Sequence, residues 1–209
     1  MIYLIGGAPR CGKTILSKQI AQQKNIPWIS TDMIRSIVLA CTPKAQMNKK
    51  FPYEKLQQEK QATPYQDVNF NPPRRLLLAE IAESKSLWPS IRKMIEHLID
   101  CELDYVLEGV HLMPGLVSQL KGTSYWKQVK LVYLVKTDLD EIKNGFLKNT
   151  SKHDWLAGAF KNTELLNRVA RMVQTKSAYI TDQAKKHDFT VVDTGRDFAK
   201  KLQVAVKQF

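Results

Sequence analysis

Residues 2–14 constrain the fold of this chain more than any other part of its sequence. The apolar run Ile2-Tyr3-Leu4-Ile5 leads into Gly7-Ala8-Pro9-Arg10-Cys11-Gly12-Lys13-Thr14. The second run has the spacing G-x-x-x-x-G-K-[ST] of the phosphate-binding P-loop. An amphipathic helical pattern follows it, with Ile15, Leu16 and Ile20 among polar residues. A strand, this loop and a helix in succession predict an α/β fold that binds a nucleotide.

Each residue type in the loop has a physical role in holding phosphate. The glycines let backbone N–H groups approach phosphate oxygens, and the positive end of the following helix faces the anion. Lys13 is expected to reach the β- and γ-phosphates, and the Thr14 hydroxyl is expected to hold Mg²⁺. The loop therefore predicts a nucleoside triphosphate and Mg²⁺ as ligands. The residues expected to bind the nucleotide are Gly7, Ala8, Pro9, Arg10, Cys11, Gly12, Lys13 and Thr14.

Further apolar runs alternate with helical stretches along the chain. This alternation predicts βαβ units and a parallel sheet that is buried on both faces. Ligands of such a sheet lie outside the carboxyl ends of its strands. The strands are expected at residues 2–5, 27–30, 105–108, 130–135 and 189–192.

Two segments interrupt the alternation. Residues 42–73 are rich in proline, glutamine, lysine and aromatic residues, and we expect an insertion on the acceptor side of the site. A long helix, expected to start near Arg74 and to kink at Pro89, follows the insertion. Residues 148–161 form a polar break between two helices, where we expect a lid, with Lys148 and Lys152 as further candidate cations.

The composition bounds the class of protein. With 209 residues, 44% of them hydrophobic, the chain is expected to form a single globular domain over residues 1–209. It has no apolar stretch of membrane-spanning length, no signal-peptide pattern, and three cysteines without paired spacing, so we expect a cytoplasmic protein without a zinc site. The net charge of +12 is dispersed along the chain, so a nucleic-acid partner is disfavoured without being excluded.

Acidic and basic side chains follow the second and third predicted strands. Asp32 is expected at a helix N-cap, where its carboxylate can accept the proton of an attacking hydroxyl, and Arg35 lies one helical turn later to bind an anionic acceptor. Glu108 is expected to position Mg²⁺, in part through water, and His111 to bind the acceptor. The alternatives are a plain capping aspartate, a surface arginine, an ion pair at a loop edge and a packed histidine.

Three arginines in the C-terminal half are further candidates. Arg168 and Arg171 share a face of a predicted helix after the lid, where a cation can neutralise charge on the transferred phosphoryl group. Arg196 follows the last strand, where it can stack on the nucleotide base. The alternative for the first two is a solvated basic helix face.

Three short motifs in this order resemble those of the 2-phosphoglycerate kinase type of small P-loop kinase. They are Gly-Gly-Ala-Pro-Arg-Cys-Gly-Lys-Thr at 6–14, Ser-Thr-Asp-Met-Ile-Arg at 30–35 and Leu-Glu-Gly-Val-His-Leu-Met-Pro at 107–114. The chain is more distantly similar to zeta-toxin and chloramphenicol phosphotransferase kinases. The resemblance implies a three-layer, adenylate-kinase-like P-loop fold with a five-stranded parallel sheet of order 2-3-1-4-5. It also implies ATP with Mg²⁺, and an acceptor hydroxyl approached by Asp32 and Arg35.

The sequence therefore predicts an ATP- and Mg²⁺-dependent kinase that phosphorylates a hydroxyl of a small, anionic metabolite. Residues 42–73 match no motif of that family, so the acceptor stays open. Two other functions remain: a nucleotide-dependent switch that hydrolyses ATP slowly, and a kinase for the ends of RNA or DNA.

Overall fold

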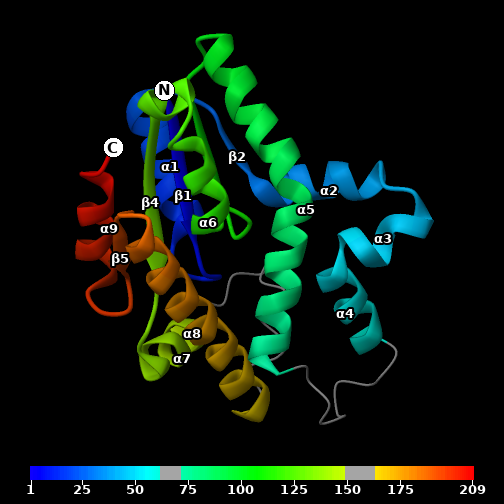
Figure 1. Cartoon of the computed structure of the whole chain (residues 1–209). Coiled ribbons are helices and arrows are strands. Elements are labelled where there is room, and N and C mark those ends of the chain that lie inside the picture. The colour runs from blue at the N-terminus through cyan, green and yellow to red at the C-terminus, as the bar shows by residue number, and fades with distance from the viewer. Residues whose placement is uncertain (62–71, 149–162) are drawn as a thin grey trace.

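The computed structural model describes residues 1–61, 72–148 and 163–209. In this part of the chain, five strands form one parallel sheet of order β2-β3-β1-β4-β5 (Figure 1). This confirms the order that the resemblance implied. The strands are β1 (Ile2–Gly7), β2 (Trp28–Ser30), β3 (Tyr105–Gly109), β4 (Val129–Val135) and β5 (Val191–Asp193).

The strand predictions are confirmed in place, and their ends differ by one or two residues. Phe189 and Thr190 precede β5, although the apolar run placed them within it. The central strand β1 pairs in parallel with β3 on one side and β4 on the other, and every one of its residues is buried. The carboxyl ends of the strands therefore meet at one edge of the sheet, as the sequence pattern requires.

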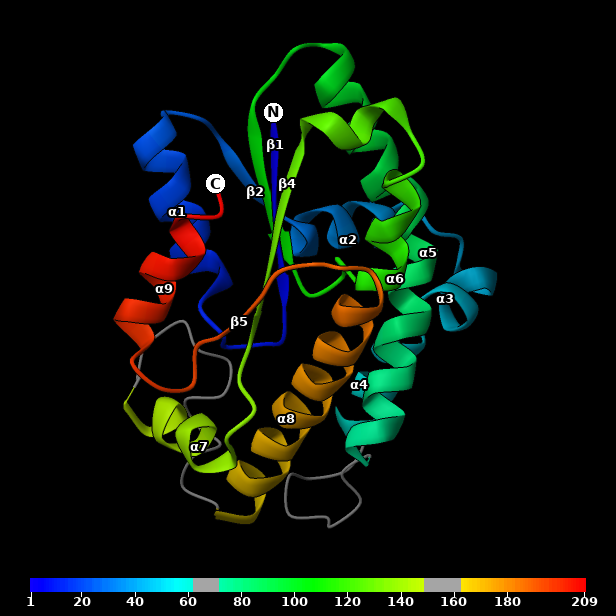
Figure 2. The same ribbon diagram turned by 60° about the vertical axis from the view of Figure 1, so that its left-hand side comes forward.

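Helices cover both faces of the sheet. α1 and α9 lie on one face, and α5, α6 and α8 lie on the other (Figure 2). The helices are α1 (Lys13–Lys24), α2 (Thr31–Ala40), α3 (Lys44–Lys50), α4 (Pro52–Gln61), α5 (Pro73–Asp100), α6 (Pro114–Val117), α7 (Leu139–Lys148), α8 (Thr163–Lys186) and α9 (Phe198–Val206), with short 3₁₀ turns at Ser118–Leu120 and Ser124–Gln128.

The helix α5 extends from the top of the molecule along most of its height, beside the sheet (Figure 1). It begins with Pro73 in its first turn, where a missing N–H is tolerated, and it continues through Pro89 to Asp100. Its buried residues recur at helical spacing, and one of them, Glu83, is charged. A buried carboxylate within an apolar stripe requires a partner, which the site supplies.

The segment 42–73, expected to be an insertion on the acceptor side, contains helical structure in its first half. Residues 44–61 form α3 and α4, which pack against α5. Phe51, between them, is buried and holds the pair in place. Residues 62–71, and all of the expected lid beyond Lys148, lie outside the described residues. Among the described helices, none combines the length and the apolar character needed to cross a membrane.

Candidate active site

The P-loop joins the buried end of β1 to the start of α1. Arg10 and Gly12 adopt left-handed backbone conformations, with φ of 60° and 95°. A Cβ at Gly12 would also lie 2.8 Å from the Phe198 ring, so glycine is required there. The N-cap of α1 is Gly12, which has no side chain to cap the helix, so the first N–H groups of α1 are available for an anion. Lys13 is buried over the loop, and its Nζ donates to the Ala8 carbonyl at 2.8 Å.

A pair of oxygen ligands lies beside the loop. The Thr14 hydroxyl donates to Glu108 Oε1 at 3.0 Å. Burial raises the pKa of the Glu108 carboxyl, while Lys13 and the hydrogen bond from Thr14 oppose that shift. A hydroxyl next to a carboxylate is a donor set that suits a hard, oxygen-seeking cation, so the residues present fit Mg²⁺.

The first residues of α2 bring Asp32 to the same edge of the sheet. The expected N-cap was wrong: Ser30 caps α2, and its hydroxyl accepts from the Asp32 N–H at 3.1 Å. The helix begins two residues earlier than its pattern indicated, and this leaves the Asp32 carboxylate without a capping role. Its side chain is 69% exposed and lies 3.6 Å from His111 Nδ1.

The position of the His111 side chain is fixed by residues at the contact between α2 and β3. Its Nδ1 lies 2.9 Å from the buried Thr31 hydroxyl. Thr31 in turn lies against Gly109, where a Cβ would approach the threonine oxygen to 1.7 Å. Burial, then the positive charges of Lys176, Arg35 and Lys13, lower the pKa of His111 to about 3. His111 is therefore neutral at physiological pH, and it lines the site as a hydrogen-bonding group without charge.

We expect this buried histidine to make the protein acid-sensitive. Its unfolded-state pKa is near 6.5 and its folded-state pKa is about 3, so the unfolded chain binds more protons between these values and stability falls as the pH drops. From pH 7 to pH 5 the loss is about 2 kcal/mol. Urea unfolding at both pH values should show that His111→Gln loses less stability between pH 7 and pH 5 than the wild type does. The exposed control His97→Gln should lose as much stability as the wild type. Equal losses in the wild type and His111→Gln would contradict the assignment.

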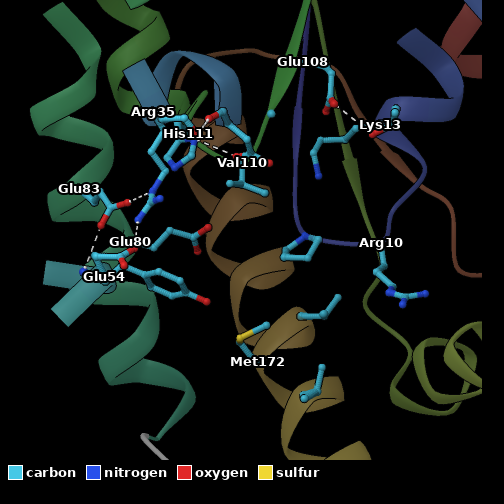
Figure 3. A pocket seen from close by; sticks show the side chains of 18 of the residues that line it. Arg10, Lys13, Arg35, Glu54, Glu80, Glu83, Glu108, Val110, His111 and Met172 are labelled. Atoms are coloured by element: carbon cyan, nitrogen blue, oxygen red, sulfur yellow. Dashed lines mark hydrogen bonds and ion pairs between the residues drawn. The ribbon is translucent and has the colours of Figure 1, made fainter. Parts of the chain in front are cut away.

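Arg35 lies in an ion-paired cluster. Its Nε donates to Glu83 Oε1 of α5 at 2.5 Å, and its Nη2 donates to Glu54 Oε2 of α4 at 2.7 Å. Figure 3 shows the guanidinium between these two carboxylates, across the cavity from Arg10 and Lys13. The sequence predicted Arg35 as an acceptor ligand and did not predict these partners.

Two cavities flank the P-loop. The first, of about 530 Å³, contains Asp32, Arg35 and His111 in its lining, together with Glu54, Glu80, Glu83 and Glu108. The second, of about 640 Å³, lies between the loop, α7 and the start of α9. Arg10, Lys13, Thr14, Phe146 and Val173 line both. A phosphate chain bound at the loop can therefore extend from one cavity into the other.

The three predicted C-terminal arginines lie outside the linings of both cavities. α8 presents Val169, Met172 and Val173 to the first cavity. Arg168 forms an ion pair with Glu164 one turn earlier, and Arg171 is exposed. Arg196 is exposed and donates to Asp138 Oδ2 at 3.0 Å, while its neighbours Gly195 and Asp197 line the second cavity. Their roles toward the nucleotide stay predictions.

Sequence reasoning missed an ion pair at the wall of the first cavity. Lys176 of α8 is buried, forms an ion pair with Glu80 of α5, and donates to the Val110 carbonyl at 3.1 Å. Burial lowers the pKa of Lys176, and the carboxylate of Glu80 opposes that shift. The signal in the sequence was the position of Lys176 on the apolar stripe of α8, one turn after Val173.

Cys11 completes the loop as a packing residue. Its side chain is fully buried, and burial raises the pKa of its thiol to about 11. Its carbonyl accepts a hydrogen bond from the Thr194 hydroxyl at 2.9 Å, which ties the loop to the end of β5. A thiol with this pKa is protonated at neutral pH, so Cys11 does not act as a nucleophile here.

Comparison with known proteins agrees with this geometry. A 2-phosphoglycerate kinase from Methanothermobacter thermautotrophicus is 24% identical over 197 residues, which cover 92% of this chain and 60% of that protein. The chain is similar to a 2-phosphoglycerate kinase. It spans about three fifths of the length of that relative. No family model matches the chain.

Solved kinases share the fold of this chain. A shikimate kinase from Bacteroides thetaiotaomicron matches all of this chain and 95% of its own, with a TM-score of 0.51 and 14% identity. A gluconokinase from Sinorhizobium meliloti matches 99% of this chain and 89% of its own, with a TM-score of 0.52 and 13% identity. The relative and these two structures are all named as kinases, and the shared architecture is that of a P-loop kinase.

Proposed function

We propose that this protein is an ATP- and Mg²⁺-dependent kinase that transfers the γ-phosphoryl group to a hydroxyl of a small, anionic metabolite, as in a 2-phosphoglycerate kinase. The observation that carries the proposal is the position of the P-loop between two cavities, with Asp32 in the lining of one of them. Its similarity to a 2-phosphoglycerate kinase and the shared kinase fold support it. The reaction is proposed for the cytoplasm, where ATP is abundant and the unpaired cysteines stay reduced.

The nucleotide half of the site follows from the loop. Backbone N–H groups of residues 7–14 and the uncapped start of α1 bind the phosphates, and Lys13 supplies a positive charge beside them. Thr14 and Glu108 would hold Mg²⁺, which neutralises charge on the β- and γ-phosphates when bound. The base is proposed to occupy the second cavity, near Gly195 and Phe198.

The acceptor half follows from α2. Among the described residues that line the first cavity, Asp32 is the one with an exposed carboxylate that is not held by a hydrogen bond to a cation. We assign it to orient the acceptor hydroxyl and to accept its proton as the oxygen attacks the γ-phosphorus. Neutral His111 stands beside it as a further hydrogen-bonding partner, and Arg35 binds an anionic group of the acceptor.

The lining of the first cavity favours a small acceptor over a polynucleotide. Among the described residues, five carboxylates line it against three cations, Arg10, Lys13 and Arg35. A nucleic-acid strand brings one negative charge with each nucleotide, so its backbone would be repelled by this wall. The carboxylates are Asp32, Glu54, Glu80, Glu83 and Glu108.

A metabolite screen tests the proposal. The protein is incubated with Mg-ATP and a set of phosphorylated and unphosphorylated hydroxy acids and sugars that includes 2-phosphoglycerate, and each compound is examined by mass spectrometry for the gain of one phosphoryl group. We expect at least one small acceptor to gain it, with ADP formed in equal amount. ATP hydrolysis without any phosphorylated product would instead favour the switch, and labelling of an oligonucleotide 5′-hydroxyl would favour the polynucleotide kinase.

A further inference from the structure

The two carboxylates that hold Arg35 are not equivalent. Glu83 lies within the buried stripe of α5, and its side chain is 1% exposed. Its second oxygen accepts the Tyr53 N–H at 3.2 Å, so both of its oxygens have partners. Removing the guanidinium from Glu83 would leave a buried charge without its cation, which is strongly unfavourable. Glu83 is therefore the permanent partner of Arg35.

Glu54 is held far less firmly. Its side chain is 31% exposed, and within the described part of the chain it forms one ion pair, with Arg35 Nη2. Glu54 also lies in the first turn of α4, where a carboxylate is favoured by the helix dipole whether or not it touches Arg35. A Glu54 side chain released into solvent regains its hydration and keeps that favourable position. Displacing Glu54 is therefore much less costly than displacing Glu83.

The position of Glu54 is also that of a ligand. Both Glu54 and Arg35 line the first cavity, on the side away from the P-loop (Figure 3). The guanidinium has five N–H donors in one plane, and Glu83 and Glu54 engage different nitrogens. A carboxylate or phosphate that enters the cavity and accepts the Nη2 N–H now bonded to Glu54 takes the place that the Glu54 carboxylate occupies.

We propose that Glu54 determines the charge of the acceptor. In the empty site its carboxylate occupies the ligand's place on Arg35, and only an anionic group of the acceptor displaces it. The inference rests on the proposed function to the extent that Arg35 contacts the acceptor. An uncharged compound does not compete with a carboxylate for the guanidinium, so it leaves the pair intact. An anion replaces one charge-assisted hydrogen bond by another of equal kind, and it gains most when it contacts both Nη groups.

The variant Glu54→Gln separates this role from a structural one. The amide keeps the size of the side chain but neither competes for Arg35 as an ion nor repels the incoming anion. Titration calorimetry with 2-phosphoglycerate alone should show binding on the order of tenfold tighter than in the wild type. The affinity for Mg-ATP should stay the same, because Glu54 does not line the second cavity, where the base is proposed to bind. Thermal stability should fall slightly, since an ion pair is lost, and damage to the fold does not explain a tighter ligand.

Glu96→Gln is the matched control. Glu96 lies on α5, forms an ion pair with Arg92 at 2.7 Å, and lines neither cavity. The variant Glu96→Gln removes the same charge as Glu54→Gln and should leave the affinity for 2-phosphoglycerate unchanged. If Glu54→Gln binds this probe no more tightly than the wild type, or if neither binds it, the proposal is overturned.

Failure of the kinase assignment gives a different pattern. If Glu54→Gln binds 2-phosphoglycerate more tightly but no acceptor is phosphorylated, the proposed reaction is rejected and the role of Glu54 is supported. If a small acceptor is phosphorylated but the wild type and Glu54→Gln bind 2-phosphoglycerate with equal affinity, the reaction is supported and the role of Glu54 is rejected.

Discussion

Asp32→Asn should reduce phosphoryl transfer on the order of 10²-fold or more while Mg-ATP still binds with wild-type affinity. The amide is nearly isosteric with the carboxylate but cannot accept the proton of the attacking hydroxyl. Because Ser30 rather than Asp32 caps α2, the substitution leaves the cap intact. The loss of a charge near the start of the helix should cost at most about 1 kcal/mol of stability. Steady-state transfer, measured with an acceptor from the metabolite screen, tests this directly.

The hydrolysis of ATP by water provides an internal comparison for this variant. Water does not have to occupy the acceptor cavity in the same way, so slow hydrolysis should fall less than transfer does. Asp182→Asn is the control, because Asp182 is exposed on α8 and pairs only with nearby surface groups, Lys186 and Gln183. Unchanged transfer in a folded, nucleotide-saturated Asp32→Asn protein would reject Asp32 as the proton acceptor.

Lys13→Ala should weaken Mg-ATP binding or lower turnover, on the order of 10²-fold, without unfolding the protein. Lys13 is the lysine within the phosphate-binding loop, and its side chain is held over the loop by a hydrogen bond to the Ala8 carbonyl. Lys18→Ala removes the same charge from an exposed position of α1 and should behave like the wild type. Calorimetry with Mg-ATP and a thermal unfolding curve for each protein give the comparison, and equal affinity together with equal turnover would reject the P-loop assignment.

The sheet and the P-loop were predictable because their signals are local. A run of apolar residues followed by a glycine-rich loop specifies a strand, a turn and a helix start within residues 2–14. The parallel sheet then places Asp32 and Glu108 at one edge, because both follow strands that end there. The predicted start of α2 was wrong by two residues, because serine, threonine and aspartate all cap helices well and Ser30-Thr31-Asp32 offers all three.

The acceptor side was less predictable because its contacts join residues that are distant in sequence. Arg35 meets Glu54 and Glu83, which lie 19 and 48 positions later, on helices whose packing no local pattern describes. The charges at Glu83 and Lys176 fall on apolar stripes, and that was the available sign of a buried ion pair. Arg168 and Arg171 share a helix face, but α8 turns the face of Val169 and Val173 toward the cavity instead.

The inert thiol in the P-loop makes the unmodified chain suitable for distance measurements by spectroscopy. Thiol reagents attack thiolates that solvent can reach, so in the folded protein Cys11 stays unlabelled. Cys41 and Cys101 are exposed, and they stand at the ends of α2 and α5, the helices that carry Arg35 and Glu83. A donor and an acceptor dye on these two cysteines would report the separation of the two helices as ligands bind, and no cysteine has to be introduced or removed.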